Sequence, residues 1–157
     1  MLAICTESLK GYGLNRIFEI VKESSLDGID LNVDPRNFDT TNSKYIKKLS
    51  EQHEIPILSI SAPSINSPKK IQELVELAHK VNTKVIVIQP PKIFDFKYIS
   101  WLKNEIPKIR QQENISISLE NGPSQTILGI IPEHAMNSIN ELKKFKHAKL
   151  ETKRDKK

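Results

Sequence analysis

The chain has 157 residues, which is enough for one domain with its own hydrophobic core. No apolar run approaches the roughly 18 residues that a membrane span requires, and no signal-peptide pattern opens the chain, so we expect a cytoplasmic protein with no membrane partner. The net charge of +5 lies at the end, because residues 143–157 hold eight basic and two acidic side chains whereas residues 1–142 hold 16 basic and 17 acidic ones.

Short apolar runs recur along the chain, and almost every one ends on a polar residue. Segments of helical pattern separate them, which is typical of repeated strand-helix units. Parallel strands in such units carry their chemistry at the carboxyl ends, so the polar end residues should gather on one rim. The expected strands span residues 2–7, 28–32, 57–61, 85–89 and 115–120, with a weaker one at 148–151. The expected rim residues are Glu7, Asp30, Ser61, Gln89, Glu120 and Glu151.

Five helices are expected between and after these strands. Asn42 and Ser67 are good N-cap residues, and Pro68 suits the first helical position. Pro107 should kink or divide the fourth helix, because proline lacks the backbone N–H and crowds the preceding turn. The helices are predicted to run from Leu14 to Ser25, from near Asn42, from Pro68, from Asp95 to Gln112, and from Pro132.

Some conspicuous side chains are expected to be structural. Cys5 lies inside the first strand and is predicted to be a buried thiol. The four histidines fall in or beside helices, where we expect surface or capping roles. The inward stripe of the first helix should comprise Ile17, Ile20, Val21 and Ser24.

Two architectures fit alternating strands and helices: an open doubly wound sheet and a (β/α)₈ barrel. The length favours the open sheet, since a full barrel needs roughly 250 residues. The glycines at Gly11 and Gly13 begin a dinucleotide-binding pattern, but Arg16 stands where its third glycine should be. The chain also has no phosphate-binding P-loop.

The strand ends, taken in order, favour the barrel. Thr6-Glu7-Ser8, Gly28-Ile29-Asp30-Leu31, Ser59-Ile60-Ser61-Ala62-Pro63, Ile88-Gln89-Pro90-Pro91 and Leu119-Glu120-Asn121-Gly122-Pro123 together resemble the xylose-isomerase-like TIM-barrel superfamily. This superfamily includes sugar and sugar-phosphate isomerases and epimerases and zinc-dependent apurinic/apyrimidinic endonucleases. The resemblance implies an incomplete TIM (β/α)₈-type barrel with five to six parallel units in sequential order. Residues 1–147 would form the partial barrel, and residues 148–157 a basic tail with a remnant of strand six.

The resemblance also implies a chemistry. Glu120 matches a superfamily glutamate that is a metal ligand and an acid/base, and Glu151 stands where the next metal ligand, normally an aspartate, would be. Such a site suits metal-assisted proton transfer through an enediolate, with Mg²⁺ or Mn²⁺ favoured over Zn²⁺ because the ligands are carboxylates. A carbohydrate substrate would contact Glu7, Asp30, Ser61, Gln89 and Asn121.

Four functions remain open at this point. A sugar or sugar-phosphate isomerase or epimerase is preferred, although this fragment alone is expected to be inactive, since the superfamily takes further ligands from later strands. An endonuclease is disfavoured, as Ser61 and Gln89 replace its histidines and residues 1–142 are not basic enough for nucleic acid. The others are a non-catalytic small-molecule-binding member of the fold and an open-sheet protein with an unrelated ligand. Open barrel edges also suggest a second chain or copy that completes the sheet.

Overall fold

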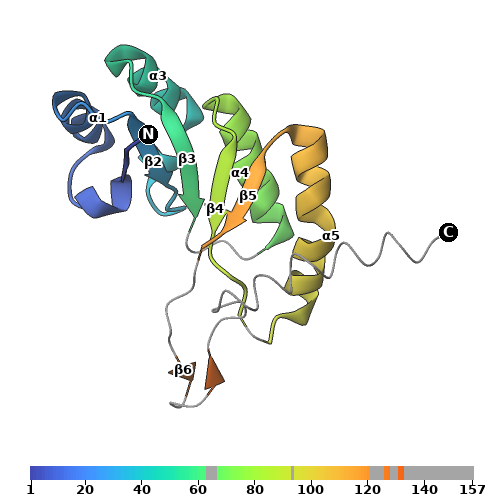
Figure 1. Ribbon diagram of the computed structural model, residues 1–157. Helices are drawn as coiled ribbons and strands as arrows, with labels where there is room; N and C mark the ends of the chain where they lie inside the picture. Colours follow the sequence, from blue (N-terminus) through green and yellow to red (C-terminus); the bar gives the residue numbers. More distant parts are fainter. Residues whose placement is uncertain (63–66, 93, 121–125, 128–130, 133–157) are drawn as a thin grey trace.

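The structure, a computed structural model, describes residues 1–62, 67–92, 94–120, 126–127 and 131–132. Five strands form one sheet in which every neighbouring pair is parallel. Their spatial order is β1-β2-β3-β4-β5, the same as their order in the chain (Figure 1). This order excludes the doubly wound sheets and confirms the expected incomplete barrel. The strands are β1 (Ala3–Cys5), β2 (Gly28–Asn32), β3 (Ile57–Ala62), β4 (Val85–Ile88) and β5 (Ser116–Leu119).

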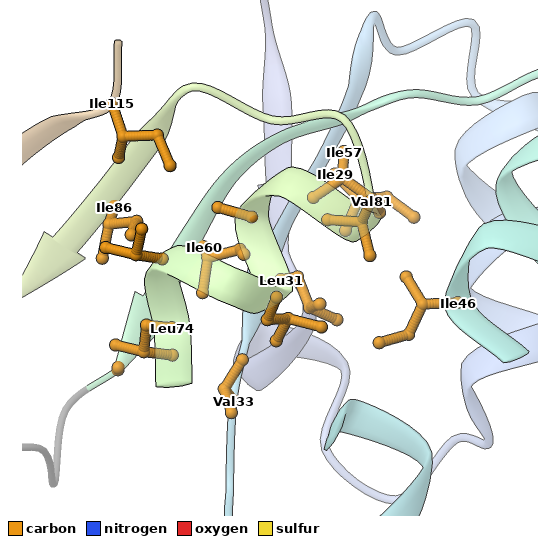
Figure 2. Close-up of a cluster of buried hydrophobic side chains, with 14 of the residues drawn as sticks. Ile29, Leu31, Val33, Ile46, Ile57, Ile60, Leu74, Val81, Ile86 and Ile115 are labelled. Carbon is orange, nitrogen blue, oxygen red and sulfur yellow. The ribbon is translucent and has the colours of Figure 1, made fainter. Parts of the chain in front are cut away.

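The two faces of the sheet differ in chemistry. One face carries branched apolar side chains that are shielded from water and packed against the helices (Figure 2). The other carries half-buried residues such as Cys5, Asp30 and Ser61. Alternation along each strand therefore directs apolar residues outward to the helices and polar residues to the inside of the curve. The fully buried strand residues of the outer face include Ile29, Leu31, Ile60, Ile86 and Ile88.

The helices begin where the sequence provides caps. Oδ1 of Asn42 accepts a hydrogen bond from the Tyr45 amide at 3.2 Å, and Oδ1 of Asp95 accepts one from the Tyr98 amide at 3.1 Å. Ser67 caps the helix that starts at a proline in the same way. The helices are α1 (Leu14–Glu23), α2 (Phe38–Thr41), α3 (Ser43–His53), α4 (Pro68–Lys80) and α5 (Phe96–Glu113), and a 3-10 helix, η1, spans Thr6–Leu9.

Some expectations about the helices were wrong. Of the two effects expected of Pro107, a division is excluded because α5 continues through it as one helix, and a kink stays a prediction. Ser24 is exposed at the C-cap of α1, and Phe18 is the fully buried residue that the expected stripe omitted. Pro132 lies in strand β7 (Ile131–Pro132), which pairs antiparallel with β6 (Thr126–Ile127), and the rest of the helix predicted from Pro132 lies outside the described residues. The predicted strand at 148–151 and the tail lie outside the described residues.

His53 was expected in a surface or capping role, but it is buried, with 9% of its surface exposed. Its Nε2 lies 3.1 Å from Oδ1 of Asn15, and its ring centroid lies 5.8 Å from that of Phe18. Both partners belong to α1, so this histidine joins α3 to α1. No helix within the described part of the chain has the length and apolar character needed to cross a bilayer.

Gly28 provides a test of how closely β2 and β3 approach. A Cβ at this position would lie 2.6 Å from the carbonyl oxygen of Pro56 and 2.6 Å from Cγ of Leu58. We expect Gly28→Ala to lower the free energy of unfolding by about 2 kcal/mol, because backbone atoms at that distance have to shift. Urea unfolding measures the change.

Gly13→Ala is the matched control, since nothing lies within 4 Å of the position that its added methyl group would occupy and its φ is −67°. It should cost less than about 1 kcal/mol, the effect of replacing glycine by alanine at an N-cap. Equal losses in the two variants would contradict the close approach of the strands.

Candidate functional site

A cleft of about 690 Å³ opens at the carboxyl ends of the strands. All five of the predicted rim residues that the structure describes contribute to its lining: Glu7, Asp30, Ser61, Gln89 and Glu120. The parallel, sequential sheet brings these residues together from five different units of the chain. Asn121 and Glu151 lie outside the described residues.

Both carboxylate oxygens of Asp30 are anchored by hydroxyl groups of β3. Ser59 Oγ donates a hydrogen bond to its Oδ1 at 2.6 Å, and Ser61 Oγ donates one to its Oδ2 at 2.9 Å. Both serines belong to β3, where Ser59 stands opposite Asp30 in the register. The ladder shifts between Ile29 and Asp30, and the shifted register places the two hydroxyls beside the two oxygens. Asp30 is thereby held in one orientation.

Cys5 completes this polar cluster from β1. Its Sγ lies 3.9 Å from Oγ of Ser61, and it is half-buried in the wall of the cleft. Burial raises the pKa of the Cys5 thiol, and the neighbouring Asp30 carboxylate raises it further, although a hydrogen bond with the Glu7 backbone opposes both. The thiol therefore stays protonated more readily than an exposed cysteine.

The first strand ends earlier than expected, and this changes how Glu7 is presented. The strand stops at Cys5, and Glu7 lies in the 3-10 helix η1 with its side chain exposed. Thr6 is buried, and its Oγ1 accepts a hydrogen bond from the amide of Asn32 at 2.9 Å. This bond fixes η1 to the end of β2, so Glu7 is held at the mouth of the cleft.

Gln89 and Glu120 follow the last two strands of the sheet. The Glu120 amide donates a hydrogen bond to the Ile88 carbonyl at 2.8 Å, which continues the β4–β5 ladder to the rim. The Glu120 side chain is exposed, and Gln89 is half-buried. Both can exchange hydrogen bonds with a hydroxyl-rich ligand, and Glu120 can also accept a proton.

Sequence reasoning missed several residues of the cleft. Thr6 and Asn32 carry the link between β1 and β2, and Tyr12 presents an exposed ring to the same cavity. Lys10 and Arg36 add two cations to the lining. The signal for the first pair was their place at strand ends, whereas loop geometry alone brings the other three to the cleft.

A metal was expected between Glu120 and Glu151. Within the described residues, no group of three or more His, Cys, Asp or Glu side chains could hold a metal ion. Glu151 lies outside those residues, so only one of the two expected ligands has a place in the structure. The described part of the cleft does not by itself fit a metal centre.

Comparisons with known proteins bear on the fold. The structure matches the probable 3-DHS dehydratase AsbF of Bacillus anthracis, involved in petrobactin synthesis, with a TM-score of 0.68 and 16% identity over 94% of this chain and 58% of that one. A xylose isomerase domain protein from Alicyclobacillus acidocaldarius matches with a TM-score of 0.67 and 13% identity, over 94% of this chain and 59% of that one. The fold is that of the xylose-isomerase-like TIM barrels. A third match is the IolI protein with a bound zinc atom, with a TM-score of 0.67 and 16% identity over 96% of this chain and 59% of that one.

These matches confirm the resemblance that the strand ends indicated. The chain spans about three-fifths of the length of these solved structures, in agreement with an incomplete xylose-isomerase-like barrel. No protein-family model matches the sequence, and no curated protein sequence matches it. The likeness therefore establishes the fold, and the roles of the cleft residues stay predictions.

The single cysteine of the chain reports on the Asp30 cluster. The pH midpoint for alkylation of Cys5 by iodoacetamide should lie above that of a free cysteine, because burial and the Asp30 charge both raise its pKa. Asp30→Asn removes the second of these causes and should lower the midpoint. Asp39→Asn, which changes a carboxylate outside the cleft lining, should leave it unchanged. A midpoint that does not move in Asp30→Asn would contradict the arrangement of the cluster.

Proposed function

We propose that the cleft is the carbohydrate site of a sugar or sugar-phosphate isomerase or epimerase. The observation that carries this proposal is the convergence of four carboxylates with amides and hydroxyls at the carboxyl rim of a xylose-isomerase-like barrel. A sugar presents alternating donors and acceptors, and such a lining can satisfy them. A solved structure with the same fold is a 3-keto-D-glucoside 4-epimerase from E. coli, which matches at a TM-score of 0.64 and 14% identity over 89% of this chain and 61% of that one.

Glu120 is the proposed acid/base. Its carboxylate would remove the proton from the carbon next to the substrate carbonyl, and the C–H electron pair would form the C=C bond of an enediolate as the carbonyl oxygen gains the charge. In an isomerisation Glu120 would then return the proton to the neighbouring carbon while the hydroxyl proton of that carbon moves to the former carbonyl oxygen. In an epimerisation a second acid on the opposite face, among the groups that the longer relatives carry beyond strand five, would deliver the proton. Its exposed position at the end of β5 leaves the carboxylate accessible to a substrate.

Asp30 and Ser61 are proposed to bind and orient the sugar. The carboxylate of Asp30 keeps lone pairs for substrate hydroxyls, because its two oxygens accept one serine hydrogen bond each. Since both oxygens are held in place, little ordering is needed when a sugar binds. Gln89 and Glu7 would add contacts from β4 and η1, and Asn121 remains a predicted contact.

A divalent metal remains part of the proposal only as a prediction from sequence. Glu120 would be its ligand among the described residues, with Glu151 as its predicted partner, and the ion would polarise the substrate oxygens. In the proposed enzyme, turnover further depends on groups that the longer relatives carry beyond strand five, so this chain alone is expected to bind a sugar without efficient catalysis.

The endonuclease alternative has less support from the site. It requires histidines at the ends of the third and fourth strands, and the cleft presents Ser61 and Gln89 there. The two described histidines, His53 and His79, lie on helices and contact Asn15 and Glu113. A non-catalytic sugar-binding member of the fold is the second candidate, and turnover assays separate it from the first.

Sugar binding is the direct test, because it does not require the full catalytic apparatus. D-glucose or D-fructose should shift the amide NMR signals of Asp30, Gln89 and Glu120 in the isotope-labelled chain. Glu120→Gln should weaken binding about tenfold, because a hydrogen bond to a charged group contributes roughly 1.5 kcal/mol.

Glu113→Gln is the matched control, since Glu113 lies on α5 outside the cleft lining and pairs with His79. It should bind both sugars as the unaltered chain does. If neither of these sugars nor D-glucose 6-phosphate shifts the cleft signals, the proposed function is wrong.

A further inference from the structure

The wall of the cleft nearest β1 and β2 contains two ion pairs. Nζ of Lys10 lies 3.1 Å from Oε1 of Glu7, and Nη2 of Arg36 lies 3.0 Å from Oδ2 of Asp34. All four residues line the cavity. The two pairs also interact electrostatically. Asp34 raises the pKa of Arg36, and the charge of Glu7 raises it further. Arg36 lowers the pKa of Asp34, and the charge of Lys10 lowers it further. The loops after β1 and β2 therefore form one charged wall.

Arg36 is held in a defined orientation within this wall. Its Nε donates to Oδ1 of Asp34 at 3.0 Å and its Nη2 donates to Oδ2 at 3.0 Å, while its backbone amide donates to Oδ1 at 2.9 Å. Three hydrogen bonds to one carboxylate fix both the turn and the guanidinium plane. Asp34 is itself placed by Thr40, whose Oγ1 accepts from the Asp34 amide and donates to its carbonyl.

This arrangement leaves one edge of the guanidinium available. The bonds to Asp34 use the Nε–Nη2 edge, and a guanidinium has five N–H donors. Nη1 and the outward hydrogen of Nη2 make no hydrogen bond with any residue that the structure describes. Arg36 is 88% exposed in the wall of the cavity, so that edge is open to a solute. A fork of two parallel N–H groups matches a carboxylate or a phosphate.

The charge balance of the cleft makes this edge selective. The described lining holds four carboxylates and two cations, and both cations lie at the β1–β2 wall, each paired with a carboxylate. An anion is therefore repelled over most of the cavity and meets the open N–H donors of Arg36 at that wall. The carboxylates are Glu7, Asp30, Asp34 and Glu120, and the cations are Lys10 and Arg36. An anionic substituent would thus bind at the β1–β2 wall, and the rest of the substrate would extend toward Asp30 and Glu120.

We propose that Arg36, positioned by Asp34 and assisted by Lys10, binds an anionic group of the substrate, a carboxylate or a phosphate, and so makes the cleft selective for acidic sugars over neutral ones. This inference rests on the proposed function and names the substrate class of the same site. Arg36 acts on binding and orientation and takes no part in proton transfer.

Three sugars that differ only at C6 provide the test: D-glucose, D-glucuronate and D-glucose 6-phosphate. At low ionic strength we expect at least one of the acidic sugars to bind the full chain about tenfold more tightly than glucose, as a charge-assisted bidentate contact allows. A gain for glucuronate alone identifies a carboxylate, and a gain for glucose 6-phosphate alone identifies a phosphate. Calorimetry or NMR titration gives the three dissociation constants.

Variants connect that preference to Arg36. Arg36→Gln should abolish the preference while glucose binding stays unchanged, and Arg36→Lys should keep only part of it because lysine lacks the fork. Arg16→Gln is the matched control, since Arg16 is also an exposed arginine in carboxylate pairs, with Glu19 and Glu23, but lies on α1 outside the cleft lining. It should leave the preference intact.

The outcomes separate this inference from the proposed function. If glucose binds but the acidic sugars have no advantage, or if their advantage survives Arg36→Gln, the anion site is wrong and the sugar site stands. If none of the three sugars binds, the proposed function fails and the anion site fails with it. Thermal unfolding of each variant verifies that the fold is retained.

Discussion

The hydrogen-bonded ladder between consecutive parallel strands is the constraint on which the site depends. Each strand pairs with the next one in the chain, so all five carboxyl ends meet at one edge. The ladder continues past the strands themselves, through the bonds from Val33 to Ser61 and from Glu120 to Ile88. An antiparallel strand in this sheet would place its polar end residue at the opposite edge. The cleft is therefore a consequence of topology before it is a consequence of any single side chain.

The same ladder separates the two chemistries of the sheet. Apolar residues on the outer face, such as Leu31 and Ile60, contact the helices and provide the buried area that stabilises the fold. The inner face of a TM barrel of this class is commonly filled by branched apolar residues, yet here Asp30 and the serines of β3 occupy it. A carboxylate is tolerated there because two hydroxyls satisfy it and the cleft admits water. The fold thus keeps a rigid, polar floor below an open mouth.

Much of this was predictable from the sequence, for identifiable reasons. The strand positions and the rim residues follow from alternation and from the polar residue at each strand end, and the capped starts of α3 and α4 follow from Asn42 and Ser67. The hydrogen bond from Ser59 to Asp30 was not predictable, because it depends on a register shift between β2 and β3. Register is a property of two strands together, and one strand's pattern does not contain it.

Other features depend on loops or on contacts between distant segments. The Arg36 fork arises from a turn that folds back on Asp34, and residue types alone do not specify that turn. His53 is buried because α1 places Asn15 and Phe18 against it. Asn15, its hydrogen-bond partner, lies 38 residues away in the sequence. A local turn therefore decided the environment of Arg36, and tertiary packing decided that of His53.

The central claim is that consecutive strands lie side by side in parallel and so converge on one cleft. Scalar couplings across hydrogen bonds in the deuterated, isotope-labelled chain measure this most directly. The account predicts two couplings between an amide nitrogen and a carbonyl carbon. One joins the nitrogen of Val33 to the carbonyl carbon of Ser61, and the other joins the nitrogen of Glu120 to the carbonyl carbon of Ile88. Couplings that instead join β1 to β3 or β4 would contradict it, since consecutive strands would then not lie side by side.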